Sequence, residues 1–290
     1  MEGLIDQINQ QLSSILGEEY HGGLKGRIHG GCISSAYIFT DGTTRFFVKV
    51  GGQESAGVLK AEYNSLLALK DNGYVRVPKP ICLVDQGPKY AIVIEWLHLS
   101  NRGNWENLGE GLANLHSYCQ ADCYGFETDN FIGLTPQHNT SETDWATFFV
   151  EHRLKFQIEL ANKRAAGLFN TSKFLDKVAQ ILSKHVTTPS LLHGDLWGGN
   201  AAFTQSGEPV IFDPATYFGD PEADLAMTRL FGGFPREFYS AYNRVRPPTP
   251  GSEQRVTIYN AYHIINHVNL FGRGYQDQAQ MMINQVLDFC

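Results

Sequence analysis

One short stretch of the chain places a carboxylate, an amide and a second carboxylate at spacings that suit phosphoryl transfer. Two leucines lead into a His-Gly-Asp sequence that ends at Asp195, Asn200 follows five positions later, and Asp213 follows a second apolar run. In phosphoryl transfer, one carboxylate orients the attacking hydroxyl, while an amide and a second carboxylate hold magnesium against the nucleotide phosphates. Because this reaction needs positioned oxygens more than covalent help, the pattern predicts Asp195 as the catalytic base and Asn200 and Asp213 as magnesium ligands.

Each of these three residues also has an ordinary structural explanation. Asp and Asn in glycine-rich turns often hydrogen-bond only their own backbone. A metal-dependent phosphoesterase would also use His, Asp and Asn, but its two-metal centre needs several further ligands. The other histidines are scattered along the chain. Three matching residues at these spacings therefore favour phosphoryl transfer over both alternatives.

Composition excludes several classes of protein. The chain has 290 residues, of which 42% are hydrophobic and 18% charged, with a net charge of −7 and no basic run. These values are typical of a soluble globular protein and argue against a basic nucleic-acid-binding surface. No apolar run approaches the ~20 residues that a membrane span needs, and the first residues do not form a signal peptide. With five cysteines and no zinc pattern, we expect a reduced, cytoplasmic protein with no nucleic-acid and no membrane partner.

The expected elements run from a strand-rich front to a helix-rich back. The first sixteen residues predict an amphipathic helix whose apolar face carries Leu4, Ile5, Ile8, Leu12, Ile15 and Leu16. Strands are expected at 36–40, 45–50, 81–84 and 90–95, and helices at 56–69, 108–117, 145–166, 174–184, 222–230, 236–244, 253–271 and 275–287. This order predicts an α+β, protein-kinase-like two-lobe fold, with a nucleotide-binding lobe at 1–97 and a catalytic, metal and acceptor lobe at 98–290.

A glycine-containing turn before the first hairpin could cover nucleotide phosphates with its backbone N–H groups. The turn is weak evidence alone, because hairpin turns are usually rich in glycine for conformational reasons. Its residues are Gly30, Gly31, Cys32, Ile33 and Ser34.

Lys49 and Glu62 are candidates for holding the nucleotide. Lys49 ends an expected strand and could reach the α- and β-phosphates, and Glu62 on the next helix could pair with it. Taken alone, both residues would be interpreted as solvated surface charges, but the downstream loop favours the ion pair. Glu95, Trp96 and Leu97 end a buried strand, so their backbone groups could bond adenine.

With these residues in place, the chain resembles the fructosamine kinase (ketosamine kinase) family, which is related to the aminoglycoside and choline kinases of the protein-kinase-like superfamily. The resemblance extends over almost the whole chain and is carried by residues 30–34, 130–133, 193–200, 211–215, 219–227 and 266–272. It implies an ATP- and Mg²⁺-dependent kinase that phosphorylates the 3-hydroxyl of ketosamines, the sugar adducts of amines. The 3-phosphate then breaks down spontaneously, so the resemblance implies protein deglycation repair, with ketosamine small molecules or glycated proteins as partners.

Trp197 is a candidate for contacting the sugar. It lies two residues after Asp195, where an indole can pack on the apolar face of a sugar while its N–H donates to a hydroxyl. The alternative is an ordinary packing tryptophan, because tryptophan is heavily buried on average.

Several neighbouring polar residues are expected to have structural roles. We expect Asp224 to bond the backbone of the catalytic loop and His193 to bond nearby backbone. His116 and His267 are interpreted as satisfied core histidines outside the site.

Cys32 is a possible redox residue. It lies in the glycine turn near Arg27, where free N–H groups and positive charge favour a thiolate. Such a thiol could link two chains, so the expected state is a monomer or a Cys32-linked dimer. The alternative is a small buried apolar residue.

Two other functions remain open at this point. One is a kinase for another small hydroxylated or amino compound, as in the aminoglycoside and choline kinases. The other is a non-catalytic nucleotide-binding scaffold, against which the presence of Lys49, Asp195, Asn200 and Asp213 argues.

Overall fold

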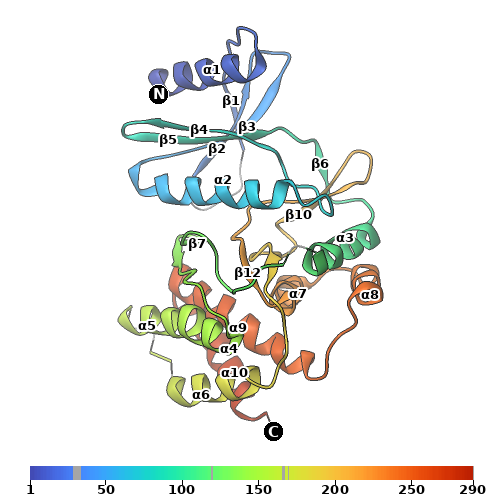
Figure 1. Ribbon diagram of the computed structural model, residues 1–290. Coiled ribbons are helices and arrows are strands. Elements are labelled where there is room, and N and C mark those ends of the chain that lie inside the picture. The colour runs from blue at the N-terminus through green and yellow to red at the C-terminus, as the bar shows by residue number, and fades with distance from the viewer. Residues whose placement is uncertain (29–33, 119, 165–166, 169, 290) are drawn as a thin grey trace. The chain divides into compact units, whose positions relative to one another are not determined.

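The computed structural model describes residues 1–28, 34–118, 120–164, 167–168 and 170–289 (Figure 1). The chain divides into two compact units, one of Met1–Gly103 with Ala202–Asp213 and the other of Asn104–Ala201 with Pro214–Cys290. None of the described helices is long and apolar enough to cross a membrane.

The division differs from the predicted boundary at residue 97. Residues 98–103 and 202–213, predicted to lie in the second lobe, belong to the first unit. The reason is strand pairing, because β6 (Leu99–Ser100) pairs antiparallel with β10 (Ala201–Thr204), which in turn pairs with β11 (Pro209–Ile211). Asp213, two residues after β11, is thereby placed in the same unit as Lys49.

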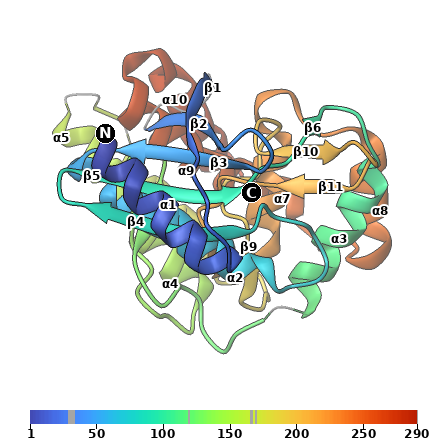
Figure 2. The ribbon, with the colours of Figure 1, turned by 90° about the horizontal axis from the view of Figure 1, so that it is seen from above.

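The first unit is built on a five-stranded antiparallel sheet with the order β1-β2-β3-β5-β4. Its α-helices and its main-sheet strands are α1 (Glu2–Leu16), β1 (Gly23–Ile28), β2 (Ser35–Thr40), β3 (Arg45–Gly51), α2 (Ala56–Lys70), β4 (Pro80–Gln86) and β5 (Lys89–Glu95), and a 3₁₀ turn at Gln53–Ser55 precedes α2. Figure 2 shows α1 lying across β4 and β5, which it contacts.

One face of this sheet packs against α1. The alternating side chains of β3 put Phe46, Val48 and Val50 into a cluster with helix residues of α1. The helix residues buried there are Leu4, Ile8 and Leu12. The predicted apolar face was wrong at its end, since Ile15 and Leu16 are 54% and 41% exposed. These two lie in the last turn, just before the left-handed Gly17 that ends the helix.

Lys49 belongs to the other set of alternating side chains on β3, and it meets α2. That helix buries Leu59, Leu66 and Leu69. Glu62 lies three residues after Leu59 and four before Leu66, so it is on the same helical face. The periodicity that packs α2 therefore also brings Glu62 to Lys49.

The second unit is mainly helical. Its α-helices are α3 (Trp105–Tyr118), α4 (Trp145–Phe149), α5 (Phe156–Lys163), α6 (Thr171–Leu182), α7 (Pro221–Arg229), α8 (Arg236–Val245), α9 (Ser252–Phe271) and α10 (Gln276–Leu287). It also has two short antiparallel sheets. One pairs β7 (Asn130–Ile132) with β8 (Thr135–Gln137), and the other pairs β9 (Ser190–Leu192) with β12 (Tyr217–Gly219). A π-helical segment, Val150–Lys155, joins α4 to α5 where the sequence predicted one continuous helix.

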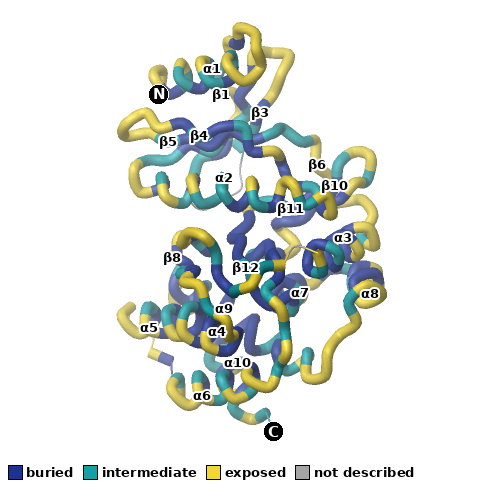
Figure 3. Tube along the Cα trace, viewed as in Figure 1, coloured by how far each residue is buried: buried dark blue, intermediate teal, exposed yellow. Residues whose placement is uncertain are grey.

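The core of this unit lies around α9, most of whose middle turns are buried in Figure 3. Trp145 and Phe149 of α4 pack against the rings of α9, and Trp145 Nε1 donates to Tyr259 Oη at 2.9 Å. This core supports the short β9–β12 sheet, from which the His193–Gly194–Asp195 loop extends.

Candidate active site

The His-Gly-Asp loop follows β9 and is held by the backbone that leads into β12. Ala215 N donates to His193 O at 2.9 Å. Gly194 has a φ of 82°, and a Cβ added there would lie 2.1 Å from Ala215 O. Only glycine fits this close, left-handed position, so the residue before Asp195 is fixed by sterics.

Asp224 on α7 anchors the same loop. Its Oδ2 accepts a hydrogen bond from His193 N at 2.7 Å, and its Oδ1 accepts one from Gly194 N at 2.8 Å. His116 Nε2 lies 3.2 Å from Asp224 Oδ2, and both residues are buried. Burial alone would raise the pKa of the Asp224 carboxyl, but His116, His193 and the Gly194 N–H together hold it below its ordinary value. The expected backbone-bonding role of Asp224 and the core position of His116 are therefore confirmed.

The Asp224→Asn variant is expected to lose about 1–3 kcal/mol of stability at neutral pH, because one buried loop N–H loses its acceptor. The pKa of the Asp224 carboxyl is lower in the folded protein than in the unfolded chain. Its contribution to stability is therefore complete above the pKa of the unfolded chain and is lost as the pH falls through the pKa of the folded protein. Urea unfolding of both proteins at pH 7 and below about pH 4 measures this, since ordinary Asp titrates near 3.9. If the difference in free energy of unfolding between the two proteins stays constant as the pH is lowered, the Asp224 carboxylate does not stabilise the loop as an ionised group.

Asp195 and Asn200 are joined by hydrogen bonds. Asn200 is buried, and its Nδ2 donates to Asp195 O at 2.8 Å and to Asp195 Oδ2 at 3.2 Å. Asp195 N in turn donates to His193 Nδ1 at 3.2 Å, which confirms the expected structural role of His193. Because the amide nitrogen of Asn200 is committed to Asp195, its Oδ1 is the atom that could bind a cation.

In the first unit, one ammonium group bridges two carboxylates. Lys49 Nζ lies 2.8 Å from Glu62 Oε1 and 2.7 Å from Asp213 Oδ1. Burial opposes the charged ammonium, but the two carboxylates outweigh it and raise the pKa of Lys49 above its ordinary value. Burial and the Asp213 charge raise the pKa of Glu62, against the pull of Lys49. The predicted Lys49–Glu62 ion pair is thus present, and Asp213 shares it.

The chemistry of Asn200 and Asp213 fits magnesium. Mg²⁺ prefers hard oxygen ligands and usually takes one or two carboxylates together with substrate phosphates. Asp213 offers a carboxylate whose side chain is 44% exposed, and Asn200 offers an amide oxygen. Asp213 has a φ of 56°, an uncommon conformation for a residue with a side chain, and such strain is concentrated at ligand sites.

Glu95 makes side-chain contacts that the sequence did not predict. Its carboxylate accepts from Arg76 Nη2 at 2.8 Å and from Lys79 N at 3.1 Å, and its own N–H donates to Lys79 O at 2.8 Å. Arg76 also binds Glu208 at 2.8 Å. The Glu95 N–H and carboxylate therefore bind Arg76 and Lys79, whereas the Glu95 carbonyl and the backbone of Trp96 and Leu97 stay candidates for bonding adenine.

Trp197 is exposed, as a residue that contacts a ligand should be. Its side chain packs over Gly199, where an added Cβ would lie 2.3 Å from the indole ring, and 37% of the residue is exposed. The ring also meets Phe231 in an edge contact with centroids 6.0 Å apart. The indole is therefore held in place by its own loop and by the segment after α7.

A pair of glycine variants tests the position of this indole. Gly199→Ala is expected to displace Trp197 and raise the acceptor KM by about two- to tenfold, the loss typical of an aromatic contact. Gly198→Ala is the matched control, because nothing lies within 4 Å of a Cβ at that position. Equal effects of the two variants on the acceptor KM, or a rise confined to the ATP KM, would show that the indole does not contact the acceptor.

Two residues near Trp197 were missed or misplaced by sequence reasoning. Phe231 carries no motif, and only its position before Gly232 and Gly233 could have indicated an unusual backbone. His267 was predicted to be a satisfied core residue, but it is only half-buried and lies 4.9 Å from the Phe231 ring.

The predicted glycine turn lies mostly outside the described residues. This concerns Gly30, Gly31, Cys32 and Ile33, whereas Ser34 is half-buried in a bend before β2. Their proposed roles stay predictions from the sequence, including the redox role of Cys32.

The family is decided by comparison with known proteins. A model of the fructosamine kinase family matches residues 4–289. The chain belongs to the fructosamine kinase family. It is 45% identical to a probable ketoamine kinase of Synechocystis sp., over 97% of this chain and 96% of that relative. It is 40% identical to a chloroplastic protein-ribulosamine 3-kinase of Oryza sativa subsp. japonica, over 90% of this chain and 78% of the relative.

Solved structures agree with this membership. A crystal structure from Haemophilus somnus, provisionally named fructosamine-3-kinase, matches with a TM-score of 0.93 and 29% identity over 99% of this chain and 98% of that one. A choline kinase from Streptococcus pneumoniae matches with a TM-score of 0.64 and 16% identity over 97% and 98% of the two chains, a likeness of fold alone. The predicted α+β, protein-kinase-like fold is therefore confirmed.

Proposed function

We propose that this member of the fructosamine kinase family is an ATP- and Mg²⁺-dependent kinase that phosphorylates the 3-hydroxyl of ketosamines. The observation that carries the proposal is the hydrogen-bonded Asp195–Asn200 pair, on a loop whose backbone is fixed by Asp224. A carboxylate held in this way can accept a hydrogen bond from a sugar hydroxyl and take its proton during transfer.

The remaining residues suit the nucleotide. Lys49, positioned by Glu62, would bind the phosphates, and Asn200 and Asp213 would hold Mg²⁺, which neutralises charge on the transferring phosphate when it is bound. The turn from Gly30 to Ser34 would cover the phosphates. The backbone of Glu95, Trp96 and Leu97 would bond adenine, Glu95 through its carbonyl, because its N–H donates to Lys79 O.

The acceptor class comes from the relatives and from Trp197. Named relatives are ketoamine and protein-ribulosamine kinases, so a ketosamine, free or attached to a protein, is the acceptor that we propose. An exposed indole two residues after Asp195 suits the apolar face of its sugar. Release of the amine after phosphorylation would make the reaction a step of protein deglycation.

The setting of the enzyme is proposed from its composition. With a net charge of −7 we propose an enzyme that binds neither nucleic acid nor membranes. With five cysteines and no zinc pattern, we propose a reduced, cytoplasmic enzyme. It would act as a monomer, or as a dimer linked through Cys32 under oxidising conditions.

A coupled ADP-release assay tests the proposed function. Wild-type protein is given MgATP with fructosamine, ribulosamine and erythrulosamine adducts, and with choline and an aminoglycoside as comparison acceptors. ADP release with a ketosamine is the expected result. Release only with the comparison acceptors would indicate a kinase of another small compound, and ATP binding with no ADP from any acceptor would indicate a non-catalytic scaffold.

A further inference from the structure

Trp197 begins a continuous series of aromatic rings on the second unit. Its ring is followed by Phe231 at 6.0 Å between centroids, His267 at 4.9 Å from Phe231, and then Phe271 and Tyr275 at 5.4 and 5.0 Å from His267. Trp197, Phe231 and Phe271 are 37%, 43% and 54% exposed. We call these five residues the aromatic ridge. A contiguous exposed aromatic surface of this kind on a soluble protein marks a site of interaction.

Phe231 is held in a strained conformation within the ridge. Its φ and ψ are 56° and 43°, in the left-handed region that bulky side chains rarely adopt. The strain is not relieved by burial of the ring. A strained backbone that holds an exposed phenylalanine beside the catalytic loop is typical of a ligand contact, because such strain persists mainly where binding uses it.

His267 contributes a hydrogen-bond acceptor to the ridge. Its Nδ1 lies 2.7 Å from His263 O, and since a carbonyl can only accept, Nδ1 carries the proton. Burial lowers the pKa of His267 more than this backbone hydrogen bond raises it, so the ring is neutral near pH 7. A neutral ring protonated at Nδ1 leaves Nε2 as an acceptor for an N–H donor.

We propose that the aromatic ridge binds the carrier of the ketosamine, namely the alkylammonium stem of a glycated lysine and the peptide next to it. The proposal rests on the proposed function, because Trp197 is assigned to the sugar and the ridge continues from it. A ketosamine nitrogen is a protonated secondary amine, which aromatic faces and the acceptor Nε2 of His267 suit. The aliphatic stem beyond the nitrogen suits the rings of Phe231 and Phe271.

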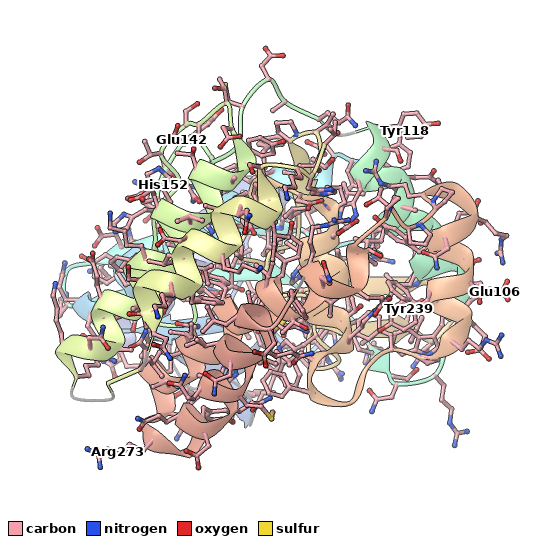
Figure 4. All side chains as sticks on the ribbon, turned by 90° about the horizontal axis from the view of Figure 1, so that it is seen from below. Glu106, Tyr118, Glu142, His152, Tyr239 and Arg273 are labelled. Carbon is pink, nitrogen blue, oxygen red and sulfur yellow. The ribbon has the colours of Figure 1, made fainter. Side chains whose placement is uncertain are left out.

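The overall charge of the chain agrees with a cationic occupant. The chain carries a net charge of −7, which favours a basic peptide over an acidic one. Arg273, the charged residue between Phe271 and Tyr275 in sequence, extends outward from the molecule in Figure 4.

The test compares two acceptors that share a sugar and differ in the carrier. One is 1-deoxy-1-methylamino-ribulose, and the other is Nε-ribulosyl-lysine within a blocked peptide. The measured quantity is the ratio of kcat/KM for the peptide to kcat/KM for the methylamine adduct. Phe231→Gly and Phe271→Ala are each expected to lower this ratio by about two- to tenfold, the effect of a lost aromatic contact.

The variants are chosen to fold. Glycine tolerates the left-handed backbone at position 231, so Phe231→Gly removes the ring and the strain together. Phe271 ends α9 and is exposed, so alanine is tolerated there. Tyr118→Ala is the control, an aromatic that is 70% exposed and lies on a different side of the unit from Arg273 in Figure 4. Its ratio is expected to stay that of wild type.

Each outcome decides a separate claim. If both phenylalanine variants keep a kcat/KM ratio within twofold of wild type, the aromatic ridge does not bind the carrier. An equal fall of this ratio in the Tyr118→Ala control would also overturn the proposal. A dimer that the same variants convert to monomer, with the ratio unchanged, would assign the ridge to self-association and also overturn it. Failure of wild-type protein to release ADP with either acceptor would overturn the proposed function itself.

Discussion

Asp195→Asn is expected to lower kcat with a ketosamine by about 10²–10⁴-fold, the usual cost of losing a general base. The amide keeps the size of the carboxylate, and the hydrogen bond from Asn200 Nδ2 to the backbone oxygen of residue 195 does not depend on the side chain. The loop should therefore remain folded, and MgATP should bind as in wild type. ADP release measures the rate, and calorimetric titration measures MgATP affinity.

The control for this variant is the anchor of the same loop. Asp224→Asn also replaces a carboxylate by an amide, but Asp224 accepts hydrogen bonds from the N–H groups of His193 and Gly194, so this variant is expected to change stability. A near wild-type rate for Asp195→Asn with a ketosamine would show that another group accepts the proton. A parallel loss of rate and MgATP affinity would show that the substitution disturbs the site more widely.

Asp213→Ala is expected to abolish magnesium-dependent ATP binding. The loss should exceed the ~10–100-fold fall in metal affinity that is typical of removing outer-shell partners, because a charged oxygen ligand is removed outright. Lys49 keeps its ion pair with Glu62 in this variant, so the buried ammonium retains one counter-charge. Calorimetric titration of ATP with and without Mg²⁺ separates the metal from the nucleotide.

Glu208→Ala is the matched control for Asp213→Ala. It removes a carboxylate of equal charge from the same unit, and its partner in the structure is Arg76. This variant should bind MgATP as wild type does. Equal MgATP affinities of wild type and Asp213→Ala would contradict the metal role of Asp213. If Asp213→Ala and Glu208→Ala lose the same MgATP affinity, the loss would be explained by the change in net charge.

Much of the fold follows from periodicity in the sequence. The helices from residue 222 onward were predicted to within a few residues of α7, α8, α9 and α10, because their apolar stripes repeat at helical spacing. The strand β1 gives no such signal, since its sequence GLKGRI has two glycines and no regular alternation. It forms because β2 offers an edge to pair with, which only the tertiary structure reveals.

The site was predictable where one motif carried it. Asp195, Asn200 and Asp224 lie in stretches whose spacing implies their contacts, and Lys49 and Glu62 meet because strand and helix periods both place them there. The ion pair of Glu95 with Arg76 was not predicted, because it joins residues from separate elements. Phe231 was missed because its strain is a property of the folded backbone, and residue types do not record it.

Product analysis with a matched substrate pair tests the central claim most directly. Wild-type protein and MgATP are incubated with a ribulosamine and with its 3-deoxy analogue, and ADP and the phosphorylated sugar are followed by ³¹P NMR. We predict one phosphorylated product, with phosphate on the 3-oxygen, and no ADP above background with the 3-deoxy analogue. Phosphate on another oxygen, or equal ADP release with both compounds, would contradict the assignment of this chain as a ketosamine 3-kinase.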